Sequence, residues 1–259
     1  MLKFSANVGL LFTELPFLER FHAARDAGFD AVEFPYCADV DAPTIRDALN
    51  AADIPQSLAN VPYEVADLGL AAAPGQRERF VARLELALAQ ADVTGCKTVH
   101  VLAGKIPTGI SEAEAEQTLM DSLRCASDLA ARAGGTVVIE AINRRAVPDF
   151  SLQSVHHAAR IVEAVNLPNV RLLLDLYHAG TVGDDMPTVI REYAHLTSYV
   201  QIAGFKNRRE PGDGAADYIA LLQGLSAAGY QGYVGAEYMP GSTTTTGLSW
   251  LRDAKLALR

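Results

Sequence analysis

The chain lacks the features that mark secreted, membrane-spanning and nucleic-acid-binding proteins. Its 259 residues contain three isolated cysteines, Cys37, Cys96 and Cys125, and no CxxC pair, so we expect reduced thiols and no disulfide framework. No apolar run approaches the ~18 residues that cross a bilayer, and the first residues show no secretory pattern. Acidic residues outnumber basic ones by 31 to 22, and the net charge of −9 argues against a nucleic-acid partner. The sequence therefore predicts a cytoplasmic protein that binds neither membranes nor nucleic acids.

Apolar residues make up 49% of the chain, which is enough for a large core. Strand patterns and helix patterns alternate from one end of the chain to the other. The predicted strands are Phe4–Val8, Ala31–Phe34, Ile54–Val61, Thr98–Leu102, Thr136–Glu140, Val170–Asp175, Ser198–Gln201 and Gly232–Glu237. The predicted helices are Pro16–Ala27, Ala42–Ala52, Gln76–Val93, Ser111–Ala133, Ser151–Val165, Met186–Tyr193, Asp217–Ala228 and Thr245–Leu258.

This regular alternation implies parallel strands joined by right-handed crossovers. Eight such units, in a chain near the ~250 residues typical of the fold, predict one α/β domain over residues 1–259, a (β/α)8 TIM barrel. A doubly wound open sheet is the alternative, but no GxGxxG follows the first strand. The active site of a TIM barrel lies at the carboxyl ends of its strands.

Four consecutive strands carry an oxygen-bearing side chain at or near the carboxyl end. The residues are Glu140, Asp175, Gln201 and Glu237. In a closed barrel these strands are neighbours, so the four side chains converge. Carboxylate and amide oxygens favour a hard cation, and we expect one divalent ion, Mg2+ or Mn2+, rather than zinc.

Further polar residues follow other strands. Asn7 and Asn60 end the first and third strands and are expected to line the pocket. Arg208, in the KNRRE run after the seventh strand, and Lys105, after the fourth, are candidates for binding a substrate carboxylate; a solvated charge run is the alternative. The segment Pro62–Gly75 is long for a connection of this kind, so it is a candidate lid.

Two buried-type titratable residues remain open to interpretation. Glu33 ends the second strand and is interpreted either as support for the site or as a salt bridge at the barrel end. His100 lies within the fourth strand and is interpreted as a satisfied core or rim histidine.

Runs along essentially the whole chain resemble one family. They are FSANVGLLF, FLERFHAARDAGFDAVEFPY, APGQ, VHVLAGKIPTG, VVIEAIN, LDLYHAG, YVQIAG, REPGDG, GYVGAEYMP and TTTTGLSW. The sequence is similar to the hydroxypyruvate isomerase family of the xylose-isomerase-like barrels, and YVQIAG with REPGDG is especially similar to the 2-oxo-tetronate isomerase branch. The resemblance implies the metal ligands Glu140, Asp175, Gln201 and Glu237. It also implies that Glu140 and Glu237 act as acid and base and that His178 hydrogen-bonds a substrate oxygen.

The chain departs from the family pattern in loops that contact the substrate. Ala59-Asn60 stands where the family often has His-Asn, and the segment Pro62–Gly75 lacks the usual Gly-Asp and Trp. Ala215-Ala216 replaces an acidic and an aliphatic residue. These departures concern the substrate more than the reaction type.

Residues and resemblance together predict an aldose–ketose type isomerase acting on a small anionic 2-oxo or sugar acid. Hydroxypyruvate to tartronate semialdehyde (2-hydroxy-3-oxopropanoate), by proton transfer through an enediolate, is the expected reaction. The alternatives are a 2-oxo-tetronate isomerase, a ketose 3-epimerase, a DNA-repair endonuclease of a related barrel, and a non-catalytic small-molecule-binding barrel. Gln201 counts against the epimerase, which usually has histidine there, and the lack of a histidine-rich zinc cluster counts against the endonuclease. A homo-oligomer remains open.

Overall fold

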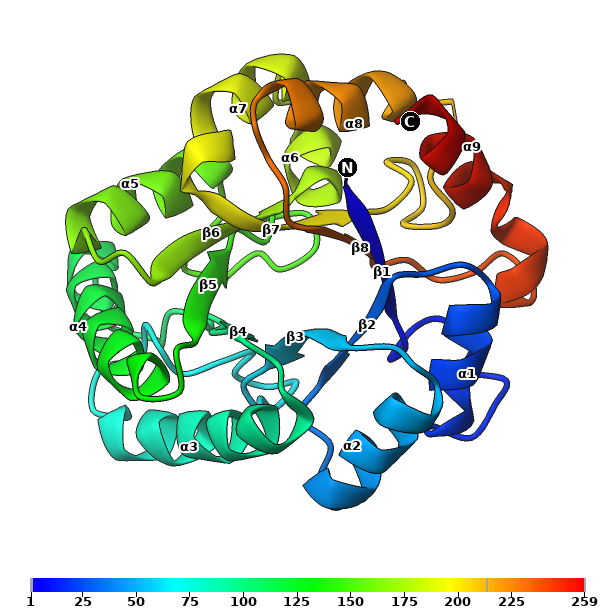
Figure 1. Cartoon of the computed structure of the whole chain (residues 1–259). Coiled ribbons are helices and arrows are strands. Elements are labelled where there is room, and N and C mark those ends of the chain that lie inside the picture. Colours follow the sequence, from blue (N-terminus) through cyan, green and yellow to red (C-terminus); the bar gives the residue numbers. More distant parts are fainter. Residues whose placement is uncertain (1, 213, 259) are drawn as a thin grey trace.

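Eight parallel strands form the centre of the molecule in the computed structural model, which describes residues 2–212 and 214–258. Each strand pairs with the next along the chain and β1 pairs with β8, so the sheet closes into a barrel (Figure 1). The strands are β1 (Lys3–Asn7), β2 (Ala31–Pro35), β3 (Gln56–Asn60), β4 (Thr98–His100), β5 (Thr136–Glu140), β6 (Val170–Asp175), β7 (Thr197–Ile202) and β8 (Tyr233–Ala236). The predicted (β/α)8 architecture is confirmed.

The helices form an outer ring around this barrel (Figure 1). They are α1 (Glu19–Asp26), α2 (Ala42–Ala51), α3 (Arg77–Thr94), α4 (Glu112–Ala131), α5 (Val155–Val165), α6 (Leu176–Val182), α7 (Met186–Tyr193), α8 (Tyr218–Ala227) and α9 (Ser249–Ala257), with 3-10 turns η1 (Ala194–Leu196) and η2 (Thr244–Gly247). None of the helices in the described residues is long and apolar enough to cross a membrane.

The helix α6 is absent from the helices expected from the sequence, because its apolar pattern is too short to stand out. Asp175 starts this helix by accepting a hydrogen bond from the backbone N–H of Tyr177 at 2.7 Å. Gly183, in the left-handed conformation with φ 95°, ends it. The side chain of Asp175 is therefore fixed by the first turn of the helix that follows it.

The last helix begins later than its sequence pattern predicts. The threonine tract before it forms the 3-10 turn η2, and α9 begins only at Ser249. The hydroxyl of Thr246 donates to the backbone carbonyl of Thr243 at 2.7 Å, and it lies 2.6 Å from the hydroxyl of Ser242. Such local bonds compete with the helix for the backbone.

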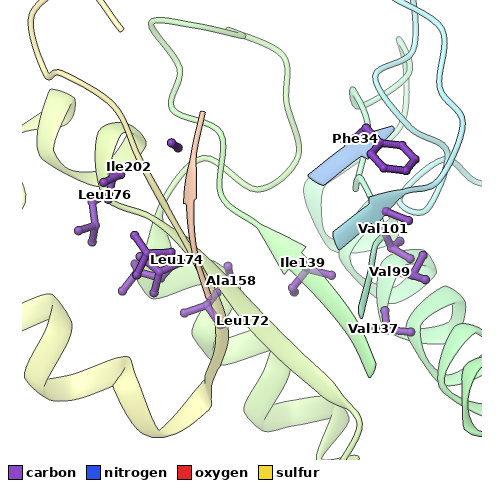
Figure 2. Close-up of a cluster of buried hydrophobic side chains, with 14 of the residues drawn as sticks. Phe34, Val99, Val101, Val137, Ile139, Ala158, Leu172, Leu174, Leu176 and Ile202 are labelled. Atoms are coloured by element: carbon purple, nitrogen blue, oxygen red, sulfur yellow. The ribbon is translucent and has the colours of Figure 1, made fainter. Parts of the chain in front are cut away.

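Alternation along the strands divides the core into two layers. Figure 2 shows outward-facing residues of β5 and β6, such as Ile139 and Leu172, in the large cluster between strands and helices. The residues between them face into the barrel, where a second apolar cluster forms from Leu58, Val138, Leu173 and Tyr199. Two positions further along β5, β6 and β7 come Glu140, Asp175 and Gln201. The two-residue period of the strands thus places these polar groups one inward-facing layer beyond the second apolar cluster.

Only part of the segment Pro62–Gly75, the predicted lid, is exposed to solvent. Leu70 and the three alanines after it are buried. Gly69 packs so closely on the carbonyl of Leu102 that no Cβ would fit, and Asp67 binds Arg83 at 2.9 Å. The part that can move is therefore the exposed half, residues 62–67.

Candidate active site

A cavity of about 390 Å³ opens at the carboxyl ends of the strands. Six of the nine residues predicted for the site line it: Asn7, Asn60, Glu140, His178, Arg208 and Glu237. Asp175 and Gln201 are buried and belong to the same charge and hydrogen-bond network. Lys105 is not among the lining residues; its backbone N–H donates to the carbonyl of Asp67.

Glu140 is the central carboxylate of this cavity. Its Oε1 is buried and has no hydrogen-bond partner. His178 Nε2 lies 3.7 Å from Oε1, and His100 Nε2 lies 3.6 Å from Oε2. Burial, and then the charges of Asp175 and Glu237, raise the pKa of Glu140 well above its ordinary value. His100 also lines the cavity, so of the two positions expected for it, core or rim, it lies at the rim.

Glu140, Asp175 and His178 form a group that could hold a metal ion. Each offers one ligand atom, and these atoms lie within 4.8 Å of one another. Asp175 Oδ2 is 3.7 Å from His178 Nε2, while its Oδ1 accepts the α6 N–H. Burial raises the pKa of Asp175, and the Arg208 guanidinium opposes that shift.

Gln201 has a buried amide oxygen that makes no hydrogen bond. Its Nε2 donates to Glu33 Oε1 at 2.7 Å, and its Oε1 has no partner among the described residues. A buried acceptor left unsatisfied costs about 1–3 kcal/mol. Two such acceptors, Glu140 Oε1 and Gln201 Oε1, beside further carboxylates fit a hard divalent cation, which both would ligate.

Glu237 follows β8 and faces Arg208. The guanidinium Nη2 donates to Glu237 Oε2 at 2.5 Å, and Asn7 Nδ2 donates to Glu237 Oε1 at 3.2 Å. Burial raises the pKa of Glu237, and Arg208 counteracts this. Both amide atoms of Asn7 are engaged with the protein, since its Oδ1 accepts from the Gly9 N–H.

Arg208 is held firmly although it lies in a loop. Its φ of 51° is in the left-handed region, where a residue other than glycine is uncommon. Its N–H donates to the Gly204 carbonyl and its carbonyl accepts from the Met239 N–H, so the loop is tied to itself and to the chain after β8. Its guanidinium lies 5.2 Å from the ring centre of Tyr177, a cation–π contact. Arg209 of the same run instead donates to the carbonyl of Pro240.

Asn143, which the sequence does not single out as a site residue, orients His178. Its Oδ1 accepts from the backbone N–H groups of Arg145 and Ala146, both at 3.0 Å, so its NH2 group must face His178 Nδ1, 2.9 Å away. His178 Nδ1 is then the acceptor, and the ring proton lies on Nε2, toward Glu140 and Asp175. Burial lowers the pKa of His178 to about 4, so the ring is neutral at pH 7.

Other contributors also lack a distinct sequence signal. Tyr63 lines the cavity from the exposed part of its loop, and burial and the charges of Glu237 and Glu140 raise its pKa. Tyr177 supports Arg208 from α6. The motif VVIEAIN contains Asn143 but gives no separate indication of its role. Asp213, in the REPGDG run, lies outside the described residues.

Comparisons with known proteins identify the family of this chain. The family model of the xylose isomerase-like TIM barrel matches residues 21–254. The hydroxypyruvate isomerase of Escherichia coli is 32% identical, covering 97% of this chain and 98% of its own. The 2-oxo-tetronate isomerase of Haemophilus influenzae is 34% identical, covering 98% and 100%. The crystal structure of a Brucella melitensis protein named AP endonuclease, family 2, superposes with a TM-score of 0.94 at 36% identity, covering 98% and 99%. The chain therefore belongs to the xylose isomerase-like TIM barrel family and, within it, is related over nearly its whole length to hydroxypyruvate and 2-oxo-tetronate isomerases.

Proposed function

We propose that this isomerase interconverts hydroxypyruvate and tartronate semialdehyde with the aid of one divalent ion. The observation that carries the proposal is the pair of glutamates on one cavity, the buried Glu140 and the partly buried Glu237, together with the unpartnered oxygens of Glu140 and Gln201 in the described residues. Relatives named hydroxypyruvate isomerase support the choice of substrate.

Glu140, Asp175, Gln201 and Glu237 are the proposed ligands of the ion, Mg2+ or Mn2+. When bound, such an ion supplies positive charge that stabilises the negative oxygen of an enediolate. His178 is not assigned as a ligand, because its Nε2 carries the proton when Asn143 donates to Nδ1. Its N–H is instead the donor for a substrate oxygen.

Arg208 is proposed to bind the substrate carboxylate, with Asn60 in the wall of the cavity. A guanidinium can donate two parallel hydrogen bonds to a carboxylate, and the Nε of Arg208 has no partner among the described residues. The stack on Tyr177 and the tied loop hold this group in place before the substrate arrives.

The reaction moves one proton between carbons and one between oxygens. Glu237, whose ionised form accepts hydrogen bonds from Arg208 and Asn7, takes a proton from the hydroxymethyl carbon, and the electron pair of that C–H bond forms the enediolate double bond. Glu140 is assigned to deliver a proton to the former carbonyl carbon. The hydroxyl proton passes to the former carbonyl oxygen, which leaves an aldehyde at one carbon and a hydroxyl at the other. Glu237 then carries one proton more and Glu140 one fewer, and proton exchange with solvent in the cavity restores both.

The four-carbon reaction of a 2-oxo-tetronate isomerase is the second candidate, because relatives of that name match the chain equally well. It needs the same chemistry at the same residues. Gln201 on β7 disfavours a ketose 3-epimerase. For an endonuclease, the metal-capable group of the described residues is not rich in histidine, and the net charge is −9. A non-catalytic barrel has no need of two glutamates on one cavity.

The test compares Glu140→Gln and Glu237→Gln with a control, Glu116→Gln, which removes a carboxylate from an Arg160 pair outside the cavity. Each site variant should lose about 10²–10⁴-fold in turnover, the usual contribution of general acid–base catalysis, while the control keeps its activity. Metal content is measured for each variant, and turnover in D2O should place deuterium on the carbon that gains a proton. Full turnover by metal-stripped protein would overturn the metal dependence. Transfer of the substrate's own hydrogen from one carbon to the other, with no deuterium taken up from D2O, would overturn the two-glutamate route.

A further inference from the structure

Glu33 is a buried carboxylate that the proposed reaction does not use. It lies on β2 with 1% of its surface exposed, inside the barrel and beneath the cavity. Three side chains donate hydrogen bonds to it. Tyr199 donates its hydroxyl to Oε2, and Gln201 and Asn7 donate their amide groups to Oε1, at 2.7 and 3.1 Å.

The barrel leaves room for this side chain to reach β7. Gly235 on β8 pairs in register with Gln201 on one side and with Ser5 on the other. A Cβ at Gly235 would overlap the carboxyl group of Glu33. The absence of a side chain at this inward position therefore lets Glu33 cross the barrel interior from β2 to the strand that carries Gln201.

The contacts of Glu33 decide which end of the Gln201 amide faces Glu33 and which faces away from it. The Asn7 oxygen is taken by the Gly9 N–H, so the two amide hydrogens of Asn7 go to Glu33 Oε1 and to Glu237. Glu33 Oε1 is therefore an acceptor, and the NH2 end of Gln201 must point at it while the amide oxygen points away. The outcome is the unpartnered Oε1 of Gln201.

We propose that Glu33 is a positioning residue that locks the Gln201 amide with its oxygen toward the metal site, and so sets the affinity for the ion. The inference rests on the proposed function, since it takes Gln201 as a ligand. Partners that orient metal ligands in this way typically change metal affinity by about 10–100-fold when mutated.

The test removes the acceptor from Glu33 and compares the result with a variant that keeps one. In Glu33→Met no acceptor faces the NH2 group of Gln201, so the amide oxygen is no longer held in one orientation, and the Kd for Mn2+ should rise about 10–100-fold. In Glu33→Gln the amide oxygen can occupy the place of Oε1 between Asn7 and Gln201, while its NH2 group faces the hydroxyl of Tyr199. This conservative variant should therefore keep most of the affinity.

A control separates positioning from stability. Ser57→Ala removes a hydrogen bond at 2.8 Å to Tyr199 in the same buried network without touching Gln201. It should lower Tm and leave the Mn2+ affinity unchanged. Gly235→Ala displaces the Glu33 carboxyl with every polar group retained, and it should weaken Mn2+ binding even if Glu33→Met does not fold.

Calorimetric titration with Mn2+ distinguishes the outcomes. Wild-type protein that binds no Mn2+ would overturn the proposed metal centre itself. Tight wild-type binding with unchanged affinity in Glu33→Met, or in Gly235→Ala, would overturn the positioning role alone. A Glu33→Gln variant as weak as Glu33→Met would do the same, because Glu33→Gln keeps the acceptor that is proposed to hold Gln201.

Discussion

Replacing Asn143 by Asp should reverse the hydrogen-bonding role of His178. The aspartate keeps the shape of the side chain and one oxygen to accept from the N–H groups of Arg145 and Ala146. Its second oxygen, however, replaces the NH2 group that now faces His178 Nδ1 at 2.9 Å. Two acceptors cannot share that contact, so the ring proton must move to Nδ1 and leave a lone pair on Nε2.

The change should reduce turnover and alter metal preference. In the proposed reaction Nε2–H donates to a substrate oxygen, and loss of one such donor usually costs about 10²–10³-fold in kcat. The freed Nε2 lies 3.7 Å from both Glu140 Oε1 and Asp175 Oδ2, where it could join them as a ligand. Imidazole suits zinc better than magnesium, and a carboxylate on the other ring nitrogen strengthens such a ligand. We therefore expect higher zinc affinity in this variant.

Nitrogen NMR of the His178 ring reports the tautomer directly, and titrations with Zn2+ and Mn2+ report the metal preference. Because the backbone hydrogen bonds of the Asn143 oxygen are retained, the Tm should change little. Asn143→Ala is the control: it loses the donor without supplying an acceptor, so kcat should fall with no gain in zinc affinity. Wild-type protein with its proton on Nδ1, or Asn143→Asp with full kcat, would refute the reasoning.

Three further outcomes can be measured on the same protein. Arg208→Lys keeps the charge but not the two-pronged donor, so KM for the 2-oxo acid should rise by about tenfold or more; an unchanged KM would exclude the carboxylate role. Because burial raises the pKa values of Glu140 and Glu237, the metal-free site retains protons that an ion must displace. The Mn2+ affinity should therefore rise with pH, and calorimetry in buffers of different ionisation enthalpy should detect proton release; its absence would contradict those pKa directions. Hydrogen exchange in residues 62–67 should slow when metal and substrate bind, whereas equal rates would leave that segment without a lid role.

The sequence predicted the parts of the site that depend on strand periodicity. A buried apolar run followed by a polar residue places Glu140, Asp175 and Gln201 at inward strand ends, because alternation and closure fix both the face and the height of these residues. The parallel order of the strands in the closed barrel could be predicted from the number of βα units alone. Both follow from short-range patterns repeated along the chain.

The remaining features depend on partners far apart in sequence. The role of Asn143 requires knowing that two backbone N–H groups already occupy its oxygen. Lys105 follows a strand as the candidate ligands do, yet the path of its loop keeps it out of the cavity wall. Burial of residues 70–73 likewise results from packing against the chain near Leu102. No local composition distinguishes these cases.

The amide side chains explain how so much negative charge can be kept in one buried place. Glu33 and Glu237 are linked by the two hydrogens of Asn7, and Gln201 adds a further donor to Glu33. These bonds favour the ionised forms, but burial prevails at Glu33 and raises its pKa to about 8. The amide N–H groups of Asn7 and Gln201 thus fix the orientation of the carboxyl groups but carry no positive charge. The positive charge comes from Arg208, which donates a hydrogen bond to Glu237. Because burial raises the pKa values of Glu140 and Glu237 as well, protons compete with a divalent ion for these carboxylates, and binding of the ion is coupled to their release.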